Sequence, residues 1–172
     1  NRDMSEDILL HRRIMGIPLQ NPDMLHITCP IVFSYPASPH YAARLDGKEV
    51  DTAIIAESTR ALTRQYDVVL IEGAGGLMVP ISDDRLTIDY ISERQLPVAL
   101  VTNGRLGSIS DTLLALEAIE RRGLELYAVI YNPHFDSDAD LAADARLYMR
   151  RYVRRHFPDA RWLDMPQKVE VP

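Results

Sequence analysis

The 172 residues are enough for one domain with a buried core, and 47% hydrophobic with 26% charged residues is typical of a globular protein. The formal net charge of −6, with no dominant basic stripe, argues against a nucleic-acid partner. A single cysteine, Cys29, excludes an internal disulfide and a cysteine-based zinc site. The sequence shows no signal-peptide pattern and no apolar stretch near the ~20 residues that span a membrane, so we expect a cytoplasmic protein.

The first third of the chain gives weak periodic signals. Asp7 precedes an apolar Ile-Leu-Leu run and is typical of an acid at a helix N-terminus. Residues 16–47 are rich in proline, which predicts a long connection over the C-terminal edge of a sheet. A helix is expected over residues 52–65, with Asp51 as its N-cap. Its inward face is predicted to carry Ile54, Ile55, Ala61 and Leu62.

Three continuous apolar runs, at residues 68–71, 97–101 and 127–131, recur about every thirty residues, the length of a βαβ unit. Because they do not alternate with polar residues, they predict strands that are buried on both faces of a parallel sheet. Amphipathic patterns predict helices over residues 112–122 and 139–156. This order of strands and helices predicts a single α/β domain that includes all 172 residues.

The most informative stretch is Glu72-Gly73-Ala74-Gly75-Gly76, which directly follows the first apolar run. Open parallel sheets bind ligands outside the carboxyl ends of their strands, where a carboxylate is well placed to hold Mg²⁺ beside nucleotide phosphates. The glycines allow backbone N–H groups to approach an anion closely. The alternative is a strand that ends in a tight glycine turn, with Glu72 solvated at the rim.

Two other predicted strand ends carry polar groups. Residues 106–111 (Leu-Gly-Ser-Ile-Ser-Asp) lead into the next helix, where free N–H groups and the helix dipole favour an anion. Capping of that helix by Ser110 or Asp111 fits the same residues. Asn132 can read the edge of an adenine, although a simple Asn-Pro turn is the plainer interpretation. No Ser/His/Asp or Cys/His set suggests covalent catalysis.

In this order, the stretches resemble dethiobiotin synthetase from about Ser5 to Pro166. The most specific element is the segment Tyr35-Pro36-Ala37-Ser38-Pro39-His40-Tyr41-Ala42-Ala43, which matches the family's proline-x-Ser-Pro-His loop. Glu72 to Gly76 and Leu106-Gly107 are the next most specific. General phosphate-loop ATPases share a similar glycine-rich turn but lack the Ser-Pro-His segment. The resemblance implies a doubly wound parallel sheet of the P-loop NTPase type.

The resemblance also implies an ATP- and Mg²⁺-dependent ligase of biotin biosynthesis. Enzymes of this family bind 7,8-diaminononanoate and CO₂, which form a carbamate that ATP phosphorylates to a mixed anhydride. The second amine then closes the ureido ring and releases phosphate. Such chemistry relies on positioning and charge neutralisation and needs no protein nucleophile. The family is homodimeric, with substrate at the subunit interface.

The resemblance assigns roles to individual positions. The residues expected at ATP and Mg²⁺ are Asp7, Glu72, Gly73, Ala74, Gly75, Gly76, Asn132, Pro166 and Gln167. The residues expected at the diamine or its carbamate are Gly75, Gly107, Ser108, Ser110 and Tyr148. Within these sets, Asp7 and Glu72 would bind the metal, Glu72 would be the catalytic residue, and Asn132 would contact adenine.

Two departures from the family pattern stand out. Ser110-Asp111 occupies a place where many members have Asn-His, and an acid there would repel a carboxylate unless it points away or caps the helix. The family's Gly-x-x-x-x-Gly-Lys-Thr loop and the Lys-Pro pair of its second strand do not occur in the chain. We therefore expect this fragment alone to be inactive and its parent protein to be active. The alternatives are another P-loop-type ATPase or amide-forming ligase of the same fold, or a non-catalytic dimerising remnant.

Overall fold

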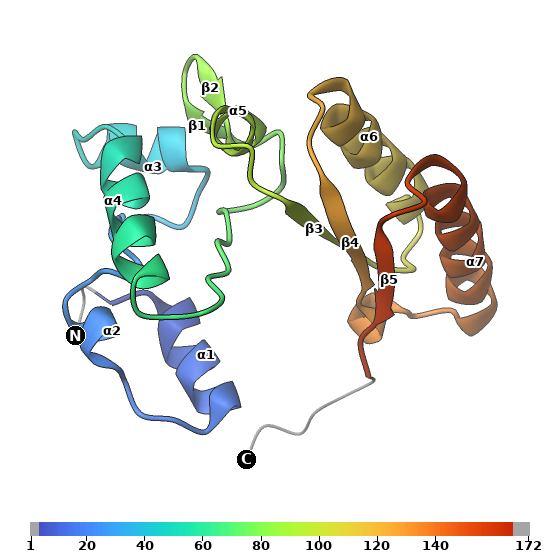
Figure 1. Ribbon diagram of the computed structural model, residues 1–172, viewed down its shortest axis with the longest axis horizontal. Helices are drawn as coiled ribbons and strands as arrows, with labels where there is room; N and C mark the ends of the chain where they lie inside the picture. The colour runs from blue at the N-terminus through green and yellow to red at the C-terminus, as the bar shows by residue number, and fades with distance from the viewer. Residues whose placement is uncertain (1–3, 167–172) are drawn as a thin grey trace. The chain divides into compact units, whose positions relative to one another are not determined.

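The computed structural model describes residues 4–166, which fall into two compact units, one up to Tyr90 and one from Ile91 (Figure 1). The elements of the first unit are α1 (Glu6–Met15), α2 (Asn21–Met24), α3 (Pro39–Leu45), α4 (Thr52–Thr63), β1 (Pro80–Ser82), β2 (Arg85–Leu86) and the start of α5 (Thr87–Glu93). The elements of the second unit are β3 (Val98–Thr102), α6 (Ser108–Arg121), β4 (Leu126–Tyr131), the 3₁₀ helix η1 (Pro133–Phe135), α7 (Ala139–His156) and β5 (Arg161–Asp164).

The second unit is built on a parallel sheet with the strand order β3-β4-β5. Val101, Ile130 and Leu163 lie side by side across its three strands. Helices α6 and α7 connect successive strands and lie together against one face of the sheet (Figure 1). Two right-handed crossovers that proceed in the same direction place their helices on the same face. The predicted α/β class with a parallel sheet is therefore confirmed.

The core of the second unit lies between this sheet and its two helices. Thr102 on β3 and Thr112 on α6 share a buried hydrogen bond of 2.6 Å between their hydroxyls. The Tyr131 ring stacks on Trp162, with centroids 6.2 Å apart, and packs with Ala145 and Met149. The largest fully buried side chains of this core are Leu116, Ile119, Val129, Met149 and Val153.

Three of the predicted helices form, and local signals explain their ends. Helix α7 has the predicted bounds, and its N-cap Asp138 accepts hydrogen bonds from two backbone N–H groups at 3.0 Å each. Asp51 caps α4 as predicted, at 2.8 Å from the Ala53 nitrogen. The inward face predicted for α4 is not buried, however, and Ile54 is 42% exposed. In the part of the chain that the structure describes, no helix has the length and apolar character needed to cross a membrane.

The strand predicted at residues 68–71 is wrong. The segment is irregular, and Val68 and Leu70 are 75% and 88% exposed. A strand needs a neighbouring strand for its backbone hydrogen bonds, and among residues 4–166 none pairs with this segment. The connection predicted at residues 16–47 also differs, because it contains the short helices α2 and α3.

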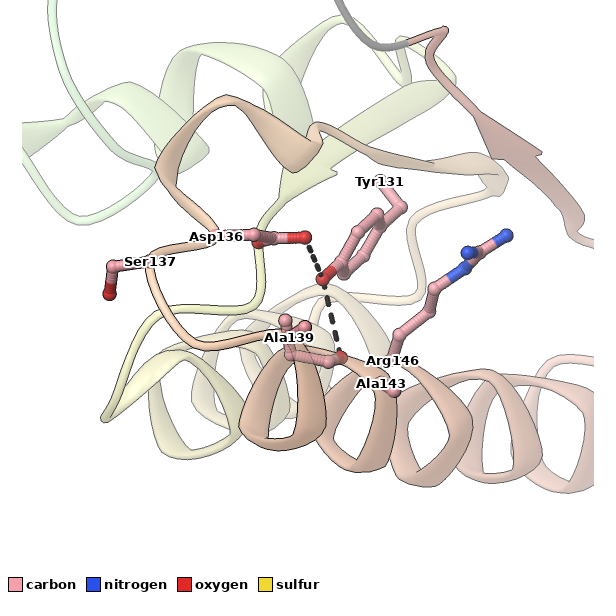
Figure 2. A pocket seen from close by; sticks show the side chains of 7 residues that line it. Tyr131, Asp136, Ser137, Ala139, Ala143 and Arg146 are labelled. Atoms are coloured by element: carbon pink, nitrogen blue, oxygen red, sulfur yellow. Dashed lines mark hydrogen bonds between the residues drawn. The ribbon is translucent and has the colours of Figure 1, made fainter.

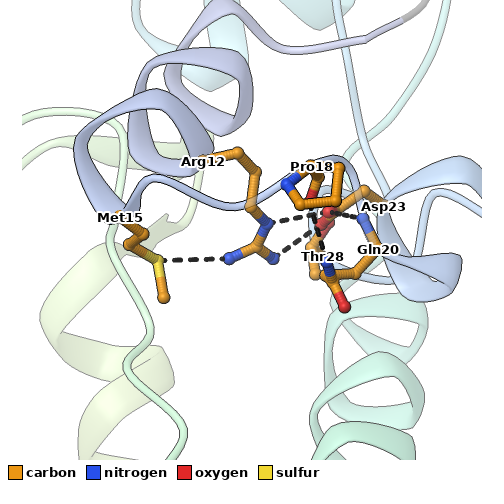
Figure 3. Close-up of polar contacts among 6 residues, drawn as sticks. All are labelled: Arg12, Met15, Pro18, Gln20, Asp23 and Thr28. Atoms are coloured by element: carbon orange, nitrogen blue, oxygen red, sulfur yellow. Dashed lines mark hydrogen bonds and ion pairs between the residues drawn. The ribbon is translucent and has the colours of Figure 1, made fainter. Parts of the chain in front are cut away.

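A buried ion pair organises the start of the first unit (Figure 3). Arg12 on α1 donates hydrogen bonds to both carboxylate oxygens of Asp23 on α2, at 2.8 and 2.7 Å. The same carboxylate accepts from the Gln20 backbone N–H at 2.7 Å and from the Thr28 hydroxyl at 2.8 Å. These four donors compensate for the burial of a charged group, and they fix α1 against the segment that follows it.

Candidate functional site

Helix α1 presents Asp7 and His11 on one face, because residues four positions apart on a helix lie one above the other. The Nε2 atom of His11 lies 3.8 Å from the Oε2 atom of Glu72. The Glu72 carboxylate therefore lies beside His11, one helical turn from Asp7 on α1. Both members of the contact are open to solvent, with side-chain exposures of 46% for His11 and 80% for Glu72.

Asp7 and Glu72 are the carboxylates of the first unit that were predicted to hold a metal ion. Within the described ranges, no three side chains of His, Cys, Asp or Glu gather in a way that could hold a metal ion. Mg²⁺ is commonly bound by one or two carboxylates together with waters and substrate phosphates, and carboxylate side chains such as those of Asp7 and Glu72 are therefore suitable ligands for it.

The glycine turn after Glu72 has two different kinds of glycine. Gly75 has a φ of +90°, and a Cβ there would lie 2.9 Å from Cγ2 of Val79. This position requires glycine because of the protein's own backbone and packing. A Cβ at Gly76 would meet no protein atom within 4 Å. The space beside Gly76 is therefore open to a ligand.

Helix α6 begins at Ser108, four residues earlier than predicted, and this overturns the capping interpretation of Ser110 and Asp111. The N-cap is Gly107, with a φ of +95° and no side-chain cap. Because glycine tolerates this conformation, the helix can start one residue after the turn. The Asp111 carboxylate instead forms an exposed ion pair with Arg105 at 3.4 Å.

Ser108, the first residue of α6, has an unusual environment. The residue is only 3% exposed, and its buried hydroxyl has no hydrogen-bond partner. Unpaired buried hydroxyls are rare because each loses its hydration without compensation. A hydroxyl of this kind at a helix N-terminus without a side-chain cap is suited to an anionic ligand.

The other predicted site residues of the second unit are less constrained. The Asn132 side-chain oxygen accepts a hydrogen bond from the His134 backbone N–H at 3.0 Å and so begins η1, as the turn interpretation predicts. Tyr148 lies on α7 and is 49% exposed. Pro166 is exposed at the end of the described chain, and Gln167 lies outside the described residues.

The structure places the predicted residues in two groups. Asp7 and the Glu72–Gly76 turn belong to the first unit. The positions that belong to the second unit are Gly107, Ser108, Ser110, Asn132, Tyr148 and Pro166.

Sequence reasoning missed a polar cluster beyond the C-terminal end of β4. A cavity of about 290 Å³ lies there, lined by Tyr131, Asp136, Ser137, Ala139, Ala142, Ala143 and Arg146 (Figure 2). Burial, and then the neighbouring Asp136, raises the pKa of Tyr131 above its usual range, so its hydroxyl stays protonated. Residues this far apart give no periodic or motif signal, so the sequence offered no way to find the cluster.

The rim of this cavity is held by a second ion pair. Arg146 on α7 contacts the Asp164 carboxylate of β5 at 2.7 Å, and its guanidinium lies 5.4 Å from the centre of the Tyr131 ring. Burial alone would raise the pKa of Asp164, but hydrogen bonds from Arg146 and Trp162 outweigh it and lower that pKa. The pair therefore ties α7 to the last strand of the sheet.

The regions of the chain that match known proteins include residues of both units. Residues 5–159 match a family model described as an AAA domain. The chain is 43% identical over 165 residues to the ATP-dependent dethiobiotin synthetase BioD 2 of Haemophilus ducreyi, which covers 96% of the chain and 78% of that protein. It is 44% identical over 163 residues to the ATP-dependent dethiobiotin synthetase BioD of Chlorobaculum tepidum, covering 94% and 68%. A BioD 2 protein of Haemophilus influenzae is 47% identical over 137 residues, covering 78% and 72%.

Proposed function

Because the chain belongs to the dethiobiotin synthetase family of ATP-dependent ligases, we propose that it carries most of the site that closes the ureido ring of dethiobiotin. The substrates are 7,8-diaminononanoate, CO₂ or bicarbonate, and ATP. Residues 1–172 form most of one α/β domain whose sheet is doubly wound. The family's phosphate-binding loop and the Lys-Pro pair of its second strand do not occur in these 172 residues, and we propose that residues 1–172 alone do not catalyse the reaction.

The reaction proceeds in three steps. One amine of the substrate attacks CO₂ and loses a proton, which forms a carbamate. A carbamate oxygen then attacks the γ-phosphorus of ATP, and ADP leaves. Finally, the second amine attacks the carbonyl carbon, phosphate leaves, and the ureido ring closes with loss of a proton. Each step needs aligned reactants and neutralised charge more than a protein nucleophile.

Asp7 and Glu72 are the residues of this chain that would hold Mg²⁺. The Glu72 carboxylate lies 3.8 Å from His11, which is one helical turn from Asp7 on α1. When bound, the ion neutralises the charge of the phosphate oxygens. The backbone of the turn from Gly73 through Ala74 and Gly75 to Gly76 lies beside the carbamate and the phosphates, and the open space at Gly76 supports this placement.

Gly107 and Ser108 bind the tail carboxylate of the diamine, and the unpaired hydroxyl of Ser108 is the single observation that carries this proposal. The bound carboxylate gives that hydroxyl the acceptor that it lacks and complements the positive end of α6. Ser110, in the first turn of α6, is a further contact. The Arg105–Asp111 ion pair offsets the negative charge that would otherwise repel the tail.

The remaining assignments follow the family pattern. Asn132 contacts the adenine, and Pro166 with Gln167 closes over the base. Tyr148, exposed on α7, reaches the tail carboxylate. The protein is a cytoplasmic homodimer in which the tail is bound by the neighbouring subunit.

A turnover assay on the whole parent protein tests the function. The protein is mixed with the diamine, bicarbonate, ATP and Mg²⁺, and dethiobiotin is followed by mass. We expect product from the wild type and a loss of about 100-fold or more in kcat/KM for Glu72→Gln, because the variant has the same shape without the charge.

The control is Glu120→Gln, which removes a carboxylate from the exposed side of the last turn of α6. Its activity should match the wild type. A folded parent protein that binds ATP but makes no dethiobiotin would contradict the ligase assignment and favour another ATPase of the same fold. Equal activities of Glu72→Gln and Glu120→Gln would contradict the metal-binding role alone.

A further inference from the structure

We propose that Asp136 is a positioning residue that holds together the two loops on which the nucleotide and diamine contacts of the second unit depend. Its carboxylate is shared between them. The Oδ1 atom accepts a hydrogen bond from the Gly104 backbone N–H at 3.0 Å. The Oδ2 atom accepts one from the Tyr131 hydroxyl at 2.8 Å (Figure 2). The importance of these loops for catalysis rests on the proposed function.

The two loops lead directly to proposed contact residues. The loop at residues 103–107 follows β3 and ends at Gly107, the N-cap of α6, with Ser108 next in the chain. The loop at residues 132–138 begins with Asn132, directly after β4, and contains Asp136 itself. One carboxylate therefore connects the segment that sets the start of α6 with the segment that carries Asn132.

The backbone at Gly104 packs closely against Tyr131, Asp136 and Ala142. Gly104 is buried, and a Cβ there would fall on the Tyr131 hydroxyl and within 2.7 Å of the Ala142 Cβ. The position therefore needs glycine because another chain segment approaches its backbone closely. A backbone hydrogen bond of 2.7 Å from Asn132 to the Thr102 oxygen joins the same two strand ends just before the loops diverge.

Removal of the carboxylate would leave the Gly104 N–H without this acceptor and the Tyr131 hydroxyl with only a longer hydrogen bond. The Tyr131 hydroxyl has one proton, and its other acceptor, the Ala142 oxygen, is farther away at 3.3 Å. The raised pKa of this phenol keeps the proton in place at neutral pH. A buried donor that loses its partner costs more than the bond itself gained, so the loops would rearrange to satisfy the two groups.

Asp136→Ala and Asp136→Asn separate positioning from general stability, in steady-state assays on the whole parent protein. An asparagine can accept from the Gly104 N–H and donate to the Tyr131 oxygen, so it keeps both links. We expect Asp136→Ala to raise the KM for ATP and the KM for the diamine, each about tenfold, with a much smaller change in kcat. Asp136→Asn should restore both constants to within about twofold of the wild type.

Asp138→Ala is the matched control, because Asp138 lies two residues away in the same loop but only caps α7. It should lower the Tm without raising either KM. Hydrogen exchange gives a readout independent of activity. In Asp136→Ala, the amides of residues 103–107 and those of residues 132 and 134–137 should all exchange faster, whereas Asp138→Ala should affect only the start of α7.

The outcomes separate this inference from the function on which it rests. If the wild type is active and Asp136→Ala raises neither KM beyond the Asp138→Ala values, the positioning role is wrong. Unchanged exchange of residues 103–107 in Asp136→Ala would also overturn it. If the wild type makes no dethiobiotin but both loops exchange faster in Asp136→Ala, the link between the loops is retained and the ligase assignment is rejected.

Discussion

Arg12 donates two hydrogen bonds to Asp23, one from Nε at 2.8 Å and one from Nη2 at 2.7 Å, and the Asp23 side chain is fully buried (Figure 3). This two-pronged geometry joins α1 to α2. Since α1 also carries Asp7, the ion pair holds a proposed metal ligand in place from about one and a half turns away along the helix.

Arg12→Ala should lower the free energy of unfolding of the parent protein by about 3 kcal/mol at pH 7, because it leaves a buried carboxylate without its countercharge. Arg12→Lys should recover only part of the loss, since an ammonium cannot donate in the two-pronged geometry. Urea denaturation measures both. Arg13→Ala, at the exposed neighbouring position, should stay within about 0.5 kcal/mol of the wild type, and an equal loss there would contradict a specific role for the pair.

The pair should also make stability depend on pH in the acid range. Hydrogen bonds from Arg12 lower the pKa of Asp23 to about 2. A carboxylate with a depressed pKa stabilises the folded state above its unfolded pKa of about 4, and this contribution is lost as the pH falls from about 4 to 2. The wild type should exceed Asp23→Asn by about 2 kcal/mol at pH 7, and the difference should shrink through this window. A difference that does not change with pH would contradict the ionic origin.

Ser108→Ala should separate binding from stability. Its hydroxyl is buried without a partner in the free protein, so removing it should leave the Tm unchanged or slightly higher. If the hydroxyl donates to the tail carboxylate, the KM for the diamine should rise about tenfold while the KM for ATP stays the same. A lower Tm, or an unchanged KM for the diamine, would argue against this site.

Gly75→Ala should lower the stability of the protein, whereas Gly76→Ala should lower its turnover. At Gly75 the φ of +90° and the 2.9 Å approach to Val79 predict a loss of about 1–2 kcal/mol in unfolding free energy. At Gly76 a methyl group meets no protein atom, so Gly76→Ala should fold with wild-type stability. Its turnover should nevertheless fall, because the methyl group would occupy the space proposed for the carbamate and phosphates. Unchanged turnover of Gly76→Ala would place those groups elsewhere.

Local signals in the chain predicted much of the second unit correctly. Helix α7 was predicted from its amphipathic period, and both its bounds are confirmed. The apolar runs at residues 97–101 and 127–131 form β3 and β4, within one residue at each end. The family was also evident from short motifs, above all the Ser-Pro-His segment at residues 38–40, because such a motif can be recognised in the sequence without knowledge of the fold.

Predictions that depended on distant partners were less successful. The run at residues 68–71 has the composition of a buried strand, yet it is exposed, because strand formation requires a neighbour and composition cannot supply one. Strand β5 (Arg161–Asp164) was not predicted, since its residues are mixed and it forms by pairing with β4. The start of α6 was misplaced because it depends on the backbone conformation of Gly107.

The sequence by itself determined the family, the chemistry of its candidate residues and the helices whose caps lie within a few positions of their own ends. Only the tertiary structure decided which of these groups are partnered. The sequence does not show which side chains are buried. The structure therefore had to show that the Ser108 hydroxyl is buried without a partner and that Glu72 is exposed. The link from Asp136 to Gly104 joins atoms 32 residues apart, and such a hydrogen bond exists only after folding has brought the two loops together.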